Sequence, residues 1–181
     1  LHYQSTCSQN APCPTRLHMA SDAENPFPER KRPAHWPALD TGTRSTLQFV
    51  TVCTKDRAPL LANPEAHACL REVWARAENL HHVGRYLLMP DHVHFFCSPA
   101  SLPPESLARW MSFWKSESAR VWPRRVAKLW QRDFWDTQLR NGDHYSERWR
   151  YVRDNPVRAG LVANPDDWPY QGEIHPLWWN D

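Results

Sequence analysis

The chain has 181 residues, of which 41% are hydrophobic and 23% charged, and these proportions exclude a wholly disordered protein. No apolar run approaches the roughly 20 residues of a membrane-spanning helix, and the N-terminus lacks the apolar stretch of a secretory signal. We therefore expect a soluble, cytoplasmic protein with no membrane partner. The net charge is only +2, yet residues 109–158 carry 12 Lys and Arg against 6 Asp and Glu. This asymmetry predicts a surface that faces a polyanion, unless these residues only form solvated helix faces.

The first part of the chain differs in composition from the rest. Residues 1–43 contain six prolines and few aliphatic side chains, which predicts a poorly ordered tail. Because the first residue is Leu, Met19 is a candidate for the true start of translation. The five cysteines form no CxxC pair, which favours reduced thiols over disulfides. Zinc bound by Cys7, Cys13 and His18 is the alternative.

The ordered part is predicted to begin with a strand over residues 47–53, which are rich in β-forming side chains. Asn63 as the N-cap and Pro64 in the first turn then open a helix, which we expect to end near Leu80. The apolar positions that recur at helical spacing in this segment are Leu70, Val73, Trp74 and Ala77.

Two strands at residues 83–89 and 92–97 are predicted to follow as a hairpin. Another helix opens at residues 103–105; its expected inward side chains are Leu107, Trp110, Met111 and Trp114, and its outward ones Arg109, Lys115 and Arg120. Residues 129–139 are expected to be extended or a strand, and residues 143–155 a final helix. A hairpin mixed with helices implies an α+β fold, in which helices pack on a ferredoxin-like antiparallel sheet.

Two histidines on one predicted strand are the first candidates for chemistry. His92 and His94 project from the same face because side chains alternate along a strand, whereas Val93 points to the other layer. Two adjacent imidazoles form half of a divalent metal site, and Asp91 lies next to them as a candidate supporting group. A pair of this spacing also arises by accident in a chain with ten histidines.

The final predicted helix supplies the second candidate group. Tyr151 and Asn155 are four residues apart and share a face, which His144 and Arg148 extend. The sequence assigns an apolar stripe of Tyr145, Trp149 and Val152 to the opposite face, which leaves Tyr151 on a polar face. The alternative is that Tyr151 is an amphipathic residue at the boundary of the core.

Three segments together resemble the IS200-like tyrosine transposases, and within them the branch associated with repeated extragenic palindromes. They are MPDHVH at residues 89–94, WQRDF at residues 130–134 and YVRDNPVRAGLV at residues 151–162. The resemblance covers about residues 44–170, which are the expected catalytic domain, and leaves residues 171–181 as a C-terminal extension.

The resemblance implies an α+β endonuclease and strand transferase that cuts and rejoins hairpin-containing single-stranded DNA through a 5′-phosphotyrosine. Tyr151 would be the nucleophile, and His92, His94 and Asn155 would hold Mg²⁺ or Mn²⁺. The expected partner is single-stranded or hairpin DNA, bound by a monomer or a homodimer. Thr137 departs from the pattern, since many relatives carry a histidine there.

Basic side chains interleaved with tryptophans are the candidates for DNA contact. The basic ones are Arg109, Lys115, Arg120, Arg124, Arg125, Arg148 and Arg158, and the tryptophans are Trp110, Trp114, Trp122 and Trp130. Core packing is the alternative for each tryptophan. Three other functions stay open: a domesticated hairpin-DNA-binding protein without turnover, an RNA-binding module, and a metallohydrolase that uses water.

Overall fold

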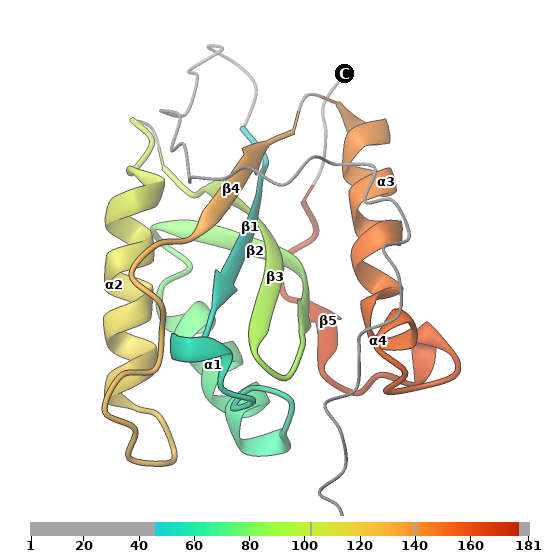
Figure 1. The fold of residues 1–181 in the computed structure, drawn as a ribbon. Helices are drawn as coiled ribbons and strands as arrows, with labels where there is room; N and C mark the ends of the chain where they lie inside the picture. Colours follow the sequence, from blue (N-terminus) through green and yellow to red (C-terminus); the bar gives the residue numbers. More distant parts are fainter. Residues whose placement is uncertain (1–45, 102, 140, 178–181) are drawn as a thin grey trace, which may run out of the picture. The chain divides into compact units, whose positions relative to one another are not determined.

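The structure, a computed structural model, describes residues 46–177 except 102 and 140 (Figure 1). These residues all belong to one unit of the chain, Arg32–Asp181. The predicted tail over residues 1–43, with Met19 and the candidate zinc ligands Cys7, Cys13 and His18, lies outside the described residues.

Five strands form one antiparallel sheet in the order β4-β1-β3-β2-β5. In chain order the elements are β1 (Gln48–Cys53), the short helix η1 (Lys55–Arg57), α1 (Pro64–Arg76), β2 (His81–Leu88), β3 (His92–Pro99), α2 (Leu107–Arg120), β4 (Trp135–Gln138), α3 (Gly142–Arg153), α4 (Asn155–Arg158), η2 (Pro165–Asp167) and β5 (Gln171–Glu173). The first four strands with α1 and α2 follow the ferredoxin-like order βαββαβ. The predicted α+β class is therefore confirmed.

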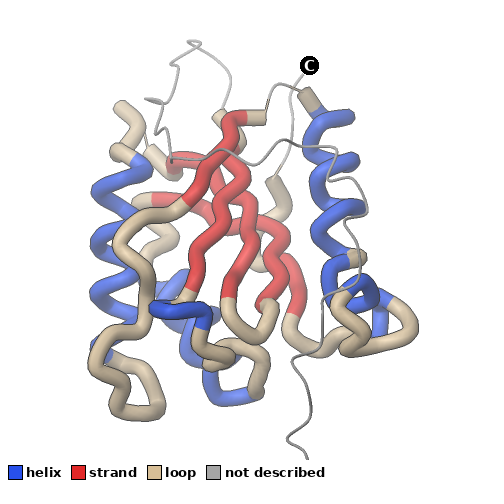
Figure 2. Tube along the Cα trace, in the orientation of Figure 1, coloured by secondary structure: helices blue, strands red, loops and turns tan. Residues whose placement is uncertain are grey.

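The sheet separates two layers of helices (Figure 2). Helices α1 and α2 cover one face and α3 covers the other (Figure 1). Strand β3 serves both layers by alternation, since Phe95 joins the buried cluster beneath α1 and α2 whereas Phe96 joins the one beneath α3. The four predicted inward side chains of α2 are all buried: Leu107, Trp110, Met111 and Trp114.

The helix ends follow local chemistry. Asn63 caps α1 as predicted, because its side-chain oxygen accepts a hydrogen bond of 2.9 Å from the backbone N–H of Ala66. Helix α1 stops at Arg76 rather than near Leu80, since Ala77 leaves the helical region at φ −103° and ψ 10°. The expected final helix is two helices, α3 and α4, with the break at Asp154; Pro156, two residues later, has no N–H to continue the helical hydrogen bonds.

Strand β5 was not anticipated, and it lies within the residues set apart as a C-terminal extension. It pairs with β2 at the edge of the sheet, with Gly172 opposite Tyr86. A Cβ atom at Gly172 would lie 2.8 Å from the hydroxyl oxygen of Tyr86, so a larger residue there would displace this ring.

Two expectations from composition can be compared with the described residues. No helix within residues 46–177, apart from the two gaps, is long and apolar enough to cross a bilayer. The cysteines of the described part, Cys53, Cys69 and Cys97, are buried and free.

Candidate active site

His92 and His94 share one face of β3, as the strand alternation predicts, and His94 stacks there on Phe49 of the cluster that α3 covers. Their rings are 4.7 Å apart between centroids and nearly perpendicular. Strand β1 runs alongside, with Cys53 opposite His92 and Thr51 opposite His94. The two imidazoles therefore share one space on the sheet.

Each imidazole is held through the same ring nitrogen. The Nδ1 atom of His92 is 2.7 Å from a carboxylate oxygen of Asp91, and Nδ1 of His94 is 2.8 Å from the hydroxyl oxygen of Thr51. Such contacts fix the ring orientation and, for a neutral imidazole that donates from Nδ1, leave the Nε2 lone pair for another partner. The second carboxylate oxygen of Asp91 is 2.7 Å from Nε of Arg57.

The electrostatic surroundings favour a neutral His94 and an ionised Asp91. Burial holds the pKa of His94 well below its usual value, and the nearby charges of His92, Arg148, Arg57 and Arg158 lower it further. Burial alone would raise the pKa of Asp91, but the hydrogen bond and charge of His92, with the charge of Arg57, outweigh it and lower this pKa. A neutral imidazole is the form that ligates a metal.

Helix α3 turns both of its predicted stripes toward the sheet, which corrects the expectation that Tyr151 lies on a face opposite the core. Tyr145, Trp149 and Tyr151 all pack, half-buried, against the cluster beneath α3. The reason is geometric: consecutive helix residues are about 100° apart, so stripes through residues 151 and 152 are neighbours. The outer face is left to exposed side chains such as Glu147 and Arg150.

Two arginines connect the tyrosine helix to the histidines. The guanidinium of Arg148 lies 5.0 Å from the ring centroid of Phe49, and the ring of Phe49 stacks on His94 at 5.5 Å. The guanidinium of Arg158 lies 4.2 Å from the ring centroid of Tyr151 and donates a hydrogen bond of 2.8 Å to its carbonyl oxygen. The charges of both arginines are felt by His94.

Asn155, the predicted third metal ligand, begins α4 directly after the tyrosine helix. Its amide oxygen accepts a hydrogen bond from Arg158, which leaves one lone pair of this oxygen for another partner. No group of three or more His, Cys, Asp or Glu side chains within the described residues is placed to hold a metal ion. The histidine pair is thus a two-residue donor set that needs an oxygen ligand from elsewhere.

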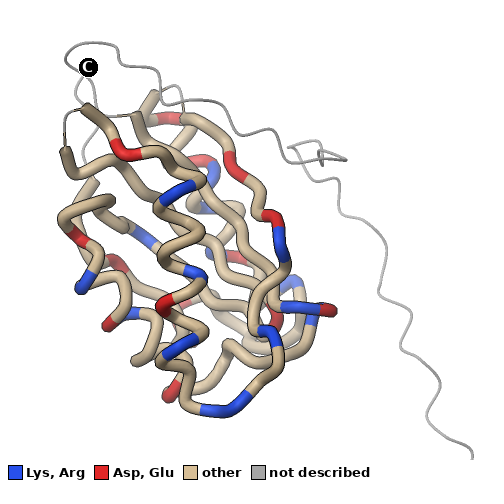
Figure 3. The backbone as a smooth tube through the Cα atoms, turned by 90° about the vertical axis from the view of Figure 1, so that its left-hand side faces the viewer, with Lys and Arg blue, Asp and Glu red and all other residues tan. Residues whose placement is uncertain are grey.

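The other predicted DNA contacts lie away from this site. Arg109, Arg120, Arg124 and Arg125 belong to α2 or the loop after it, in the layer on the other side of the sheet. Three of them form ion pairs, Arg109 with Glu105, Arg120 with Glu117 and Arg124 with Glu65. Seen from the α2 side, Lys and Arg are interspersed with Asp and Glu (Figure 3). Only Arg148 and Arg158 of the predicted set join the histidines.

Lys115 corrects the expectation of an outward side chain. Its ammonium is half-buried and donates hydrogen bonds of 3.0 to 3.1 Å to the backbone carbonyls of Gln131, Arg132 and Asp133. Its three donors are thus occupied by the loop that precedes β4. The tryptophans fit their core alternative, since Trp110, Trp114 and Trp130 are buried and Trp122 packs half-buried against them.

Thr51 and Arg57 contact the site but were not among the residues predicted from the sequence. Strand alternation carries the signal for Thr51, because it pairs with His94 across β1 and β3. No pattern points to Arg57, whose contact depends on a left-handed backbone at φ 56°. Thr137, on β4, pairs with Phe49 of β1 and so lies on the same face as the histidines.

Comparisons with known proteins found a family model and relatives that match this chain. The family model described as transposase IS200 like matches residues 43–148, a range that includes both histidines and ends before Tyr151. A REP-associated tyrosine transposase of Escherichia coli K12 is 23% identical over 126 residues, covering 67% of this chain and 73% of the relative. A putative REP-associated tyrosine transposase of Haemophilus influenzae is 27% identical over 113 residues, covering 51% and 62%.

A solved structure gives independent support for the fold. It is described as a REP-associated tyrosine transposase bound to a REP hairpin, and it matches with a TM-score of 0.61 at 21% identity. The match covers 79% of this chain and 81% of that one.

Proposed function

We propose that this chain, which belongs to the IS200-like transposase family, cuts and rejoins single-stranded DNA through a covalent link to Tyr151. One observation supports this most: His92 and His94 are held through Nδ1 on the sheet face that the Tyr151 helix covers. A binding module needs neither feature. A water-using hydrolase would not need the tyrosine.

The reaction follows from the groups at the site. The Tyr151 oxygen attacks a backbone phosphorus, forms a P–O bond and gives up its proton, while the bond to the 3′ oxygen breaks and that oxygen takes up a proton. The products are a 5′-phosphotyrosine and a free 3′-hydroxyl. Because one phosphodiester replaces another, attack by a 3′-hydroxyl reverses the step without ATP. Arg148 and Arg158 stand beside the tyrosine and offset the charge of the phosphate.

A divalent cation fits the residues present. The Nε2 atoms of His92 and His94 would be its nitrogen donors, and the Asn155 oxygen would be the third ligand. Bound there, Mg²⁺ or Mn²⁺ would polarise the scissile phosphate. Hard cations prefer carboxylates and water to imidazole, so we expect weak, exchangeable binding, with Mn²⁺ the better fit.

Hairpin DNA with a single-stranded flank is the proposed substrate. A solved relative of the same fold is described as bound to a REP hairpin, and this chain shares its architecture over most of both lengths. Arg148 and Arg158 would bind the backbone phosphates of this DNA. We propose that the protein acts as a monomer or a homodimer.

The test is incubation of the full-length protein with labelled hairpin DNA from the flanks of its own gene and Mn²⁺, followed by a denaturing gel. We expect a covalent protein–DNA band that a chelator abolishes. His92→Ala and His94→Ala should lose the band and keep most of the affinity, since phosphate contacts supply most of the binding. Normal adduct formation by both variants would exclude the metal role, and tight binding without any adduct in the parent would indicate a hairpin-binding protein without turnover.

A further inference from the structure

We propose that Arg57 is a positioning residue of this site, which holds the Asp91 carboxylate in the orientation that fixes His92. The inference deepens the proposed function and rests on the metal role of His92. It concerns a residue outside the three segments that carry the family resemblance.

A continuous series of side-chain contacts runs from Arg57 through Asp91 to His92. The Asp91 carboxylate is shared, with one oxygen 2.7 Å from Nδ1 of His92 and the other 2.7 Å from Nε of Arg57. The Arg57 guanidinium also donates from Nη1 to the thiol sulfur of Cys53 at 2.7 Å. Cys53 is the strand partner of His92. Arg57 therefore contacts both the residue opposite His92 and the residue that precedes it.

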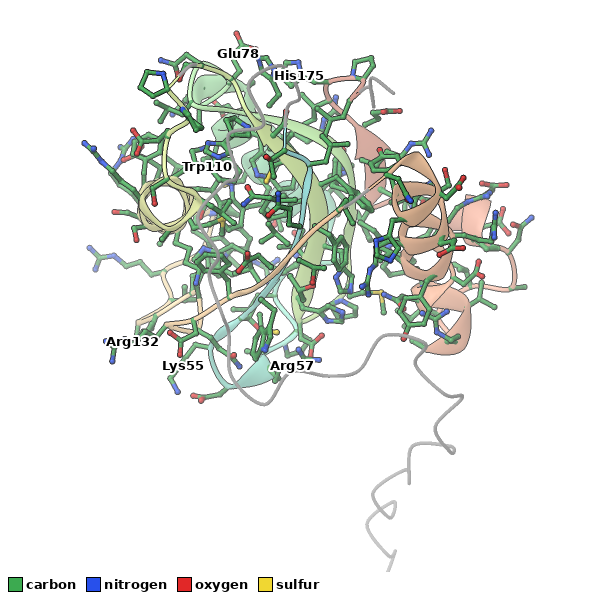
Figure 4. All side chains as sticks on the ribbon, turned by 90° about the horizontal axis from the view of Figure 1, so that it is seen from above. Lys55, Arg57, Glu78, Trp110, Arg132 and His175 are labelled. Carbon is green, nitrogen blue, oxygen red and sulfur yellow. The ribbon has the colours of Figure 1, made fainter. Side chains whose placement is uncertain are left out.

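The backbone directly after β1 is hydrogen-bonded to the turn that precedes β3. Thr54 donates to the carbonyl oxygen of Asp91 from its backbone N–H at 2.9 Å, and its hydroxyl lies 2.8 Å from the carbonyl oxygen of Ala58 and 3.0 Å from that of Asp91. The η1 segment that follows is thereby held against the turn that carries Asp91 and leads into β3. Arg57 lies in this segment beside Lys55 at the end of β1, whereas Trp110 lies between α2 and the sheet (Figure 4).

Two non-glycine residues of this segment occupy the left-handed region, Asp56 at φ 55° and Arg57 at φ 56°. Glycine adopts this region without the clash that a Cβ creates. Asp56 pairs only outward, with the exposed Lys55, whereas Arg57 reaches the site. The segment thus directs the Arg57 side chain toward Asp91 through a backbone conformation that residues other than glycine rarely adopt.

The two adjacent positions offer a matched pair of variants, Arg57→Gly and Asp56→Gly. Each variant places glycine at a positive φ, which relieves the same backbone strain. Neither variant should therefore lower the melting temperature through a change in the backbone. Only Arg57→Gly removes a contact to Asp91. A merely structural Arg57 would reveal itself as a loss of stability, with Mn²⁺ binding unchanged in the folded protein.

The experiment measures Mn²⁺ binding to the full-length protein by electron paramagnetic resonance and, separately, the Nδ1–H signal of His92 by NMR in metal-free protein above pH 6.5, about the pKa of free histidine. We expect Arg57→Gly to weaken Mn²⁺ binding about tenfold, the lower end of the loss seen when the direct partner of a metal ligand is removed, because Arg57 acts through Asp91. We also expect it to broaden the Nδ1–H signal. Asp56→Gly should match the parent in both.

The outcomes separate the two proposals. If the parent and Arg57→Gly bind Mn²⁺ equally and show the same Nδ1–H signal, the positioning role of Arg57 is wrong and the transposase mechanism stands. If the parent binds no Mn²⁺, or binds it as well as His92→Ala does, the metal role of His92 is wrong and the role of Arg57 with it. A loss in both Gly variants alike would assign the effect to the turn rather than to the Arg57 side chain.

Discussion

The two faces of the sheet share the same strands but bury different kinds of side chains. Toward α1 and α2 the strands meet a layer of aromatic rings, in which Trp114 contacts Trp74, Phe95 and Trp130. Toward α3 the strands present His92 and His94, each held by a polar neighbour. Both faces bury apolar area, and the face toward α3 holds the histidine pair and its polar neighbours in addition.

The difference indicates how a small domain separates stability from chemistry. The side chains beneath α1 and α2 are closely packed, and their burial contributes to stability. The layer beneath α3 is bordered by arginines and by Tyr151, which are half-buried or exposed. A substitution on the first face should therefore change the free energy of unfolding, and one on the second should change DNA cleavage or metal binding.

The largest effect is expected from Tyr151→Phe on the α3 face. Loss of a nucleophile reduces a rate by several orders of magnitude, whereas removal of one hydroxyl group changes packing little. We expect near-parental hairpin affinity, parental stability and no covalent adduct on a denaturing gel. Tyr145→Phe is the control, because Tyr145 packs on Phe96 and burial raises the pKa of its phenol to about 12. An adduct in Tyr151→Phe, mapped to another residue by mass spectrometry, would overturn the assignment.

Trp114→Ala tests the opposite face. Trp114 is fully buried, and truncation of a core tryptophan typically costs about 3–5 kcal/mol. Denaturant unfolding should show this loss, while Mn²⁺ affinity stays parental under conditions where the variant is folded. Phe113→Ala on the same helix is the control, since Phe113 is 43% exposed and its loss should change stability little. A loss of Mn²⁺ affinity in folded Trp114→Ala would contradict the separation of the faces.

The sequence predicts the first of these faces more completely than the second. Helical spacing identifies the buried side of α2, and strand alternation places His92 and His94 together, because both are local periodic signals. The apolar stripe of α3 was placed correctly toward the core, but the stripe of Tyr151 was not, since a helix packed broadly on a sheet buries more than one stripe. Strand β5 has three residues and no pattern, so its existence depends on pairing with β2.

The support of the histidines was only partly predictable. Asp91 is adjacent in sequence and was foreseen as a supporting group, and its contact with His92 is present. Arg57 is 34 residues from Asp91 in the chain, and it reaches the carboxylate only through a left-handed turn that the sequence does not signal with glycine. Contacts that depend on such a turn appear only in three dimensions.

The pH dependence of stability gives a further test of the aromatic face. His81 is buried against the ring of Trp110 at 4.6 Å, and burial lowers its pKa from 6.5 to about 4. Between these values the unfolded chain binds a proton that the folded protein does not, so stability falls as the pH falls from 6.5 to 4. The contribution is about 3 kcal/mol. His81→Phe should flatten this part of the unfolding profile, whereas His82→Phe, at a half-buried position, should not. An unchanged slope in His81→Phe would assign the acid sensitivity to other groups.

Thr51→Val is the smallest change and the sharpest test of the polar face. It replaces the hydroxyl that holds Nδ1 of His94 with a methyl group of nearly the same size. The loss of one hydrogen bond should reduce the free energy of unfolding by about 1 kcal/mol. The freed imidazole can rotate and change tautomer, so Mn²⁺ affinity should fall about tenfold, and DNA cleavage at limiting Mn²⁺ should fall with it. Thr137→Val is the matched control, because Thr137 lies on the same face of the sheet opposite Phe49. If both valine variants bind Mn²⁺ as the parent does, the orientation of His94 does not depend on Thr51, and the covering ring of Phe49 must hold it instead.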